Sequence, residues 1–145
     1  MKISGTHVLP AAPQQVWDLL NDPARLAKCL PGCEKLEPTG PDQYKVAIKF
    51  ALAAFSGAYA GAVALTEKDA PKSMRMRVEG KGTPGFMKGE GLLKLAEKGG
   101  QTQVSYEGEA QVGGVIAAVG QRMIEAAAKK IIGQFFESAQ KQLRD

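Results

Sequence analysis

Residues 113–145 read GGVIAAVGQRMIEAAAKKIIGQFFESAQKQLRD, and the apolar residues of this stretch recur at helical spacing. After Gly113-Gly114, about thirty residues are expected to be helical, a length of about 45 Å. The apolar stripe contains Ile116, Val119, Met123, Ala127, Ile131, Phe135 and Ala139, and it is widened by Ile124, Ile132 and Phe136. A stripe of this width predicts a helix that lies across a sheet and contacts apolar groups along both flanks.

Upstream of this helix the apolar residues recur every second position, which is typical of strands. The clearest case is MRMRVEGK at residues 74–81, where Met74, Met76 and Val78 share one face and the charged residues share the other. Strands are predicted at residues 1–9, 33–38, 43–50, 58–68, 74–81, 87–95 and 103–112. The short connections between them predict antiparallel pairing.

Two short helices are predicted between the first and second strands. Pro13 suits the first turn of one helix, and Pro23 suits the first turn of the next, with Asn21 or Asp22 as its cap. Pro31-Gly32 would end the second helix, because proline disfavours helix at the preceding residue and glycine adopts turn conformations at low cost.

This order of elements predicts an α+β fold in one domain, residues 1–145. A strongly curved antiparallel sheet of about six to seven strands would wrap around the long C-terminal helix. Glycines at 80, 82, 85, 89 and 91 would allow the strands to bend. We expect such an arrangement to leave a cavity between sheet and helix.

Composition excludes several classes of protein. The chain carries 19 basic and 15 acidic residues, a net charge of +4, and only 6% aromatic residues. A nucleic-acid binder would cluster its basic residues and interleave aromatic ones, so nucleic acid is not an expected partner. No apolar run reaches the roughly 18 residues that span a bilayer, and no signal peptide is recognisable. The expected location is therefore the cytoplasm.

Three strings resemble the family of the carbon monoxide dehydrogenase G subunit, within the START and Bet v 1-like (helix-grip) superfamily. They are LPAAPQQVWDLLNDPARLAKCLPGCE at residues 9–34, GFMKGEG at 85–91 and VGGVIAAVGQRMIEAAAKKIIGQFF at 112–136. The Leu-Pro-Gly-Cys string after Asn-Asp-Pro is the most specific element, and the resemblance covers nearly the whole chain. It implies a helix-grip fold and a protein that binds a ligand without being an enzyme.

The resemblance also implies a ligand class and partners. The ligand would be an isoprenoid quinone or a related lipid, bound without any covalent or metal cofactor. The protein partner would be a molybdenum-containing oxidoreductase of the carbon monoxide dehydrogenase type, with peripheral contact at the inner face of the membrane. This sequence ends at Asp145, without the C-terminal tail by which some relatives reach the membrane, so we do not expect membrane anchoring through such a tail.

The residues expected to line the cavity are mostly apolar. Methionine adapts its shape and suits a flexible apolar ligand, while Ala58, Ala60, Ala62, Ala64, Gly89 and Gly91 would remove side-chain volume. The predicted lining is His7, Leu26, Leu30, Phe50, Tyr59, Met74, Met76, Val78, Phe86, Met87, Tyr106, Val119, Met123 and Ala127. Entry of a ligand would require movement of the CLPGC corner at residues 29–33 or of the turn at residues 82–86.

The polar candidates each leave two interpretations open. His7 would face the cavity and donate a hydrogen bond to a quinone carbonyl or lipid head group, or the opposite parity would turn it to solvent. Tyr59 and Tyr106 would offer hydroxyls to a polar ligand end, or they would form an aromatic packing pair. Cys29 and Cys33 flank Leu-Pro-Gly; with a single His in the chain they lack the ligands of a zinc site, and we interpret them as apolar residues at a chain reversal.

Enzymatic motifs are absent from the sequence: there is no G-x-S-x-G, H-E-x-x-H or G-x-x-x-x-G-K-[ST] string. Two alternatives to a carrier remain. One is a small cyclase or hydratase of the polyketide-cyclase type, which requires an inward acid or base near His7, Tyr59 or Tyr106. The other is a surface adaptor with a collapsed core, which requires large exposed apolar patches.

Overall fold

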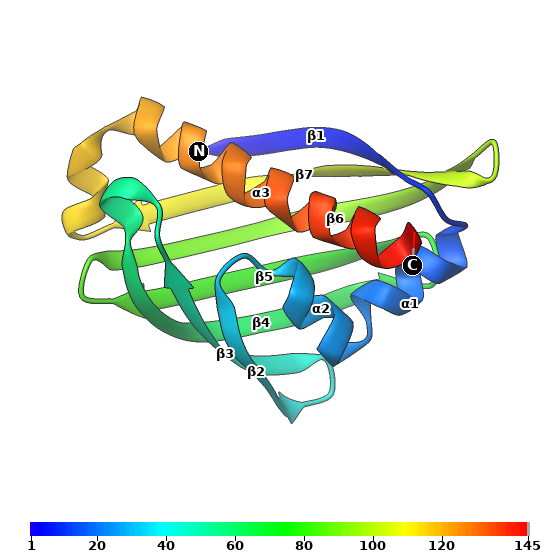
Figure 1. The fold of residues 1–145 in the computed structure, drawn as a ribbon, viewed down its shortest axis with the longest axis horizontal. Helices are drawn as coiled ribbons and strands as arrows, with labels where there is room; N and C mark the ends of the chain where they lie inside the picture. The colour runs from blue at the N-terminus through cyan, green and yellow to red at the C-terminus, as the bar shows by residue number, and fades with distance from the viewer. Residues whose placement is uncertain (145) are drawn as a thin grey trace.

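A seven-stranded antiparallel sheet curves around the C-terminal helix in the computed structural model, which describes residues 1–144 (Figure 1). The order of strands is β1-β7-β6-β5-β4-β3-β2, so β1 and β2 form the two edges. Asp145, the last residue of the predicted helix, lies outside the described residues. The predicted α+β fold is confirmed. Its strands are β1 Lys2–Leu9, β2 Cys33–Gly40, β3 Gln43–Phe50, β4 Gly57–Asp69, β5 Ser73–Gly82, β6 Gly85–Lys98 and β7 Gln101–Gly113.

Two short helices follow β1, as predicted: α1 spans Pro13–Leu20 and α2 spans Pro23–Cys29. Each has its proline in the first turn, where the missing N–H costs no helical hydrogen bond. Of the two candidate caps for α2, Asp22 takes the role, because its carboxylate accepts a hydrogen bond from the N–H of Ala24 at 3.1 Å.

The long helix α3 covers Gln121–Arg144, 24 residues and about 36 Å, so the predicted thirty residues and 45 Å were wrong. Residues Val115–Val119 form a separate 3₁₀ turn, η2. Gly114 and Gly120 flank it with φ of 81° and 93°, in the left-handed region that a right-handed helix cannot continue through. A second 3₁₀ turn, η1 at Ala53–Phe55, lies between β3 and β4 and contacts η2.

The interior beneath α1 and α2 is filled, and we call this part the packed end. Its sheet floor comes from Val63, Leu65, Met74, Leu95 and Val104, all of which are buried. Val16, Leu19 and Leu20 of α1 and Leu26 of α2 complete the same cluster. The Thr102 hydroxyl donates to the carbonyl of Ala11 at 2.7 Å and so ties β7 to the start of α1.

Hydrogen bonds between α2 and α3 close the packed end. The Ser138 hydroxyl donates to the carbonyl of Lys28 at 2.7 Å, and the Gln142 amide donates to the carbonyl of Arg25 at 3.0 Å. Because the last carbonyls of a helix lack intrahelical partners, the Ser138 hydroxyl satisfies a carbonyl of α2 that would otherwise depend on water. The C-terminal half of α3 is thereby fixed over the sheet.

Candidate ligand-binding cavity

A cavity of about 260 Å³ lies between the sheet and the N-terminal and central turns of α3. It is near the lower limit of about 300–1,000 Å³ that is usual for small-molecule sites. Its side chains are mainly apolar. They come from the sheet (Ile3, Ile48, Phe50, Tyr59, Met76, Val78, Met87, Leu93, Tyr106, Ala110 and Val112), from the CLPGC corner and η1 (Leu30, Pro31 and Phe55), and from α3 (Ile124, Ala127, Ala128, Ile131, Ile132, Phe135 and Phe136).

The floor of the cavity is bare backbone at Gly80, Gly89 and Gly91. The sheet register places Gly89 opposite Val78 and Gly91 opposite Met76, on the inner face. A Cβ at Gly89 would lie 3.9 Å from the nearest atom, the carbonyl oxygen of Glu109, so a side chain would fit there without overlap. The open volume therefore exists because these inward positions carry no side chain.

The predicted contribution of the alanines was wrong. In β4 the alternation turns Tyr59, Val63 and Leu65 inward, so the four alanines at 58, 60, 62 and 64 lie on the outer face of the sheet. Because apolar residues occupy both faces of this strand, its hydrophobic pattern does not show which face is turned toward the interior. The volume is removed by the predicted glycines at 89 and 91, together with Gly80.

Eight of the fourteen residues predicted to line the cavity belong to its wall, and their contact with a ligand stays a prediction. Those from the sheet are Phe50, Tyr59, Met76, Val78, Met87 and Tyr106, and the others are Leu30 and Ala127. Leu30 is accompanied by Pro31, so the CLPGC corner borders the cavity.

Three predicted residues are excluded from the wall by packing or by their element. Leu26 and Met74 are fully buried in the packed end, because α1 and α2 cover that part of the interior. Val119 lies in η2, outside the long helix to which the sequence assigned it, and packs on a small cluster around Phe55 and Ile116.

Two more predicted residues lie on the surface, and a third lies behind the wall. Phe86 is on the outer face of β6 and 40% exposed, and Met123 is 46% exposed near the start of α3. His7 faces inward on β1 and Val8 is exposed, which is the first of the two orientations that the sequence left open. However, Phe136 lies between His7 and the cavity. The rings of His7 and Phe136 are stacked, with their centroids 4.2 Å apart.

His7, Tyr106 and Phe136 form an aromatic cluster at the edge of the cavity. Their rings are nearly parallel, with centroids 5.8 Å apart for Tyr106 and Phe136 and 6.1 Å apart for His7 and Tyr106. Burial lowers the pKa of His7 below its usual 6.5, since a charged imidazolium would lose hydration there. The imidazole is accordingly neutral at neutral pH.

The hydroxyl of one of the two tyrosines in the wall has a hydrogen-bond partner, and the hydroxyl of the other has none in the described part of the chain. The Tyr59 hydroxyl donates to the carbonyl of Phe55 at 2.8 Å, and its ring packs edge-on against Phe50 at 5.7 Å. For Tyr59 the packing interpretation therefore holds. The Tyr106 hydroxyl makes no hydrogen bond to any group within residues 1–144, so it remains available.

The sequence did not reveal most of the wall. The α3 residues Ile124, Ile131, Ile132 and Phe135 were recognised as an apolar stripe, but the stripe alone does not show which part faces a hollow and which part faces packed side chains. Phe55 gave no usable signal, because it follows an irregular connection after β3 and reaches the cavity only through η1.

The comparisons with known proteins agree with this geometry. The family model for the G subunit of carbon monoxide dehydrogenase (CoxG) matches residues 5–144, nearly the whole chain. The chain belongs to the CoxG family. Among solved structures, a conserved protein from Geobacillus kaustophilus is 36% identical and superposes with a TM-score of 0.95, over 99% of this chain and 95% of that one. No curated protein matches the sequence.

More distant structures support the fold of this CoxG family member. A START superfamily protein from Mycobacterium smegmatis has a TM-score of 0.77 at 11% identity, covering 99% of this chain and 97% of that one. Ara h 8.0201 has a TM-score of 0.72 at 14% identity, with the same coverage. The CoxG family and the START-like fold together support a role in binding hydrophobic ligands.

The CLPGC string, the most specific CoxG-like element, forms the reversal from α2 into β2. Gly32 has a φ of 72°, and its carbonyl accepts a hydrogen bond from the N–H of Lys49 at 2.8 Å, which ties the corner to β3. Both cysteines are free thiols. Cys29 is buried and accepts a hydrogen bond from Gln142 at 3.3 Å, and burial raises its pKa to about 11. This thiol is therefore protonated and structural.

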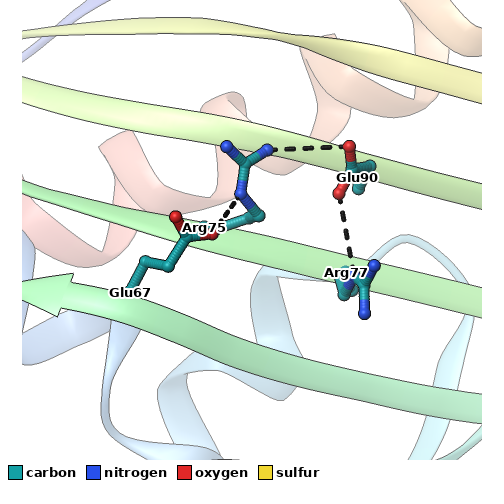
Figure 2. Close-up of polar contacts among 4 residues, drawn as sticks. All are labelled: Glu67, Arg75, Arg77 and Glu90. Atoms are coloured by element: carbon teal, nitrogen blue, oxygen red, sulfur yellow. Dashed lines mark hydrogen bonds and ion pairs between the residues drawn. The ribbon is translucent and has the colours of Figure 1, made fainter.

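The outer face of the CoxG sheet is charged. The two carboxylate oxygens of Glu90 lie 3.6 Å from Nη1 of Arg75 and 3.6 Å from Nε of Arg77. Arg75 also forms an ion pair with Glu67 (Figure 2). These pairs hold the pKa of Arg75 above its usual value. They confirm that Arg75 and Arg77 belong to a solvated stripe. A wide hollow of about 520 Å³ on this face is lined by charged side chains and by Ala62 and Ala64.

Three charged residues of β5 and β6 border the cavity without directing their side chains into it. Glu79, Lys88 and Glu90 alternate with the inward Val78, Gly80, Gly89 and Gly91, so their side chains point to the outer face. Within residues 1–144, no group of three His, Cys, Asp or Glu side chains is placed to hold a metal ion. None of the helices described is both long and apolar enough to cross a membrane.

Proposed function

We propose that this protein binds an isoprenoid quinone or a related lipid in the cavity between sheet and α3, and that it performs no chemistry on it. The observation that carries the proposal is the apolar cavity over the glycine floor at Gly80, Gly89 and Gly91. Protein interiors are normally filled to the density of organic crystals. An apolar hollow of this size is most simply explained by a ligand that fills it.

Burial of apolar surface supplies the affinity in this proposal. Each CH₂ group transferred from water contributes about 0.8 kcal/mol. The cavity of about 260 Å³ accommodates a ring or a short chain, and the remainder of a long tail would leave through the side bordered by Leu30 and Pro31. Entry would require movement of this corner, whereas the turn after β5 is held by the hydrogen bond from the N–H of Ile116 to the carbonyl of Pro84 at 2.9 Å.

The partner in this proposal is a molybdenum-containing oxidoreductase of the carbon monoxide dehydrogenase type, to which the protein would present its ligand. Support comes from membership of the CoxG family, whose name refers to that enzyme. The proposed location is the cytoplasm, with peripheral contact at the inner face of the membrane. The net charge of +4 supports a weak attraction to anionic lipids.

Each alternative lacks a feature that it requires. A cyclase or hydratase would place an acid or base in the cavity, but the wall's Glu79 and Glu90 direct their carboxylates to the outer face. An adaptor with a collapsed core would have a filled interior, in contrast to the cavity beside Phe136 and Tyr106.

The test is native mass spectrometry on freshly purified protein, followed by organic extraction of whatever is released. We expect an isoprenoid quinone or lipid at about one per chain, or uptake of added quinone by ligand-free protein. Gly89→Leu should fill the floor and reduce uptake at least 10-fold, because its side chain enters the space that the ligand requires.

Ala60→Leu is the matched control, since it adds a similar side chain to the outer face of the same sheet. It should leave uptake within twofold of the wild type. Protein that is bare after purification and takes up no added quinone would show that the proposal is wrong.

A further inference from the structure

The side chains that face the cavity include very few polar groups. Two carry a hydroxyl, Tyr59 and Tyr106, and the charged residues of the wall point outward. Because the Tyr59 hydroxyl already donates a hydrogen bond to the carbonyl of Phe55, Tyr106 carries the hydroxyl that can bond to a polar atom of a ligand.

The Tyr106 hydroxyl belongs to a residue of the cavity wall and has no partner among the protein groups that the structure describes. Among residues 1–144, the enclosed side-chain polar atom that lacks a hydrogen-bond partner is Oδ1 of Asn21. The Tyr106 hydroxyl also lacks a partner there, but it is not fully enclosed by protein atoms. A hydroxyl in a largely apolar wall is costly unless something bonds to it.

The position of this hydroxyl is fixed by its neighbours. Tyr106 is paired with Gly5 across β1 and β7, and its ring lies over that glycine, where an added Cβ would be 2.6 Å from Oη and 2.8 Å from Cζ. Phe136 stacks on the ring from α3, with His7 behind it. The absence of a side chain at Gly5 is thus what allows the ring to lie in this place.

We propose that Tyr106 orients the ligand by donating a hydrogen bond to a carbonyl oxygen on a planar ring. The apolar tail would then cross the glycine floor and leave through the side bordered by Leu30 and Pro31. This inference rests on the proposed function and adds to it the class of head group and the direction in which the ligand lies.

The chemistry of the wall favours a neutral ring over a charged lipid head group. A phosphate would require free cations, but Lys88 directs its ammonium to the outer face, and the Met1 ammonium donates a hydrogen bond to the carbonyl of Ala110 at 3.0 Å. Tyr106 is suited to a carbonyl because burial raises the pKa of its hydroxyl, which therefore stays protonated and able to donate. The flat faces of Tyr106 and Phe136 offer offset stacking to a ring.

The experiment compares two matched probes, a 1,4-naphthoquinone with a decyl chain and a naphthalene with the same chain. Equilibrium dialysis gives the Kd of each for the wild type, Tyr106→Phe and Tyr59→Phe. We expect Tyr106→Phe to weaken quinone binding about 3- to 10-fold, the effect of one neutral hydrogen bond, and to change naphthalene binding less than twofold. Tyr59→Phe should change both probes by the same factor, because its hydroxyl serves the protein.

A second measurement on the wild type does not depend on any variant. The carbonyl stretching band of the bound quinone should shift to lower frequency than in an apolar solvent, and Tyr106→Phe should remove the shift. An unshifted band, or equal effects of Tyr106→Phe on both probes, would overturn the role of Tyr106. If neither probe binds the wild type, it is the proposed function that fails.

Discussion

The packed end and the cavity lie between the same sheet and the same helix, yet one is filled and the other is hollow. At the packed end the inward residues of β5, β6 and β7 include Met74, Leu95 and Val104, and α1 adds a further layer. A few residues along the same strands, the inward positions are Gly80, Gly89 and Gly91, and only α3 covers them. Side-chain size on one face, together with the reach of α1, therefore decides where space is left.

The largest expected effect separates two methionines on the same strand. Met74→Ala should lower the free energy of unfolding by about 2–5 kcal/mol, because it opens a cavity in a filled core. Met76→Ala, two residues along, should cost less than about 1.5 kcal/mol, because Met76 already borders open space.

Urea unfolding followed by circular dichroism measures both variants, with the m-value as a check on two-state behaviour. Equal losses would mean that the hollow is packed in solution, and the comparison between the two ends would fail.

Substitutions at two glycines should change the free energy of unfolding by an intermediate amount and in opposite directions. Gly61→Ala should destabilise by about 1–3 kcal/mol, because its Cβ would overlap the carbonyl oxygen of Glu79 on β5. Gly89→Ala should be neutral or stabilise by up to about 1 kcal/mol, because the space above it is open and alanine restricts the unfolded chain more than glycine does.

Thermal unfolding of the two variants side by side tests this prediction. Each variant is the control for the other, since both add one methyl group to the inner face of the sheet. A loss of stability in Gly89→Ala as large as that in Gly61→Ala would show that the floor is not open.

The smallest expected effect is a dependence of stability on pH at the border between the two regions. Burial lowers the pKa of His7, so the unfolded chain binds a proton at this residue more readily than the folded protein. The contribution of His7 is present above about pH 6.5 and is lost as the pH falls through the lower pKa of the folded state.

His7→Phe keeps the ring stacked on Phe136 and removes the titrating group. The free energy of unfolding of both proteins should be measured from pH 7.5 to 5. As the pH falls, the wild type should lose more stability than the variant. A difference that is constant over this range would contradict the burial of His7.

The local patterns predicted much of this molecule from its sequence. Alternation in 74–81 placed Met76 and Val78 inside, because a strand presents successive side chains to opposite faces. Pro13, Pro23 and the cap at Asp22 located the short helices through effects that act within one turn. Family membership was likewise visible in the order of elements and in the LPGC string.

What the sequence did not determine depends on contacts between distant segments. The alanines of β4 could face either way until pairing with β3 and β5 fixed their parity. Met74 and Met76 have the same pattern, and only the position of α1 and α2 makes one a core residue and the other part of a cavity wall. The free hydroxyl of Tyr106 depends on Gly5 and Phe136, which are about a hundred and thirty residues along the chain from one another, and the tertiary fold alone brings them together.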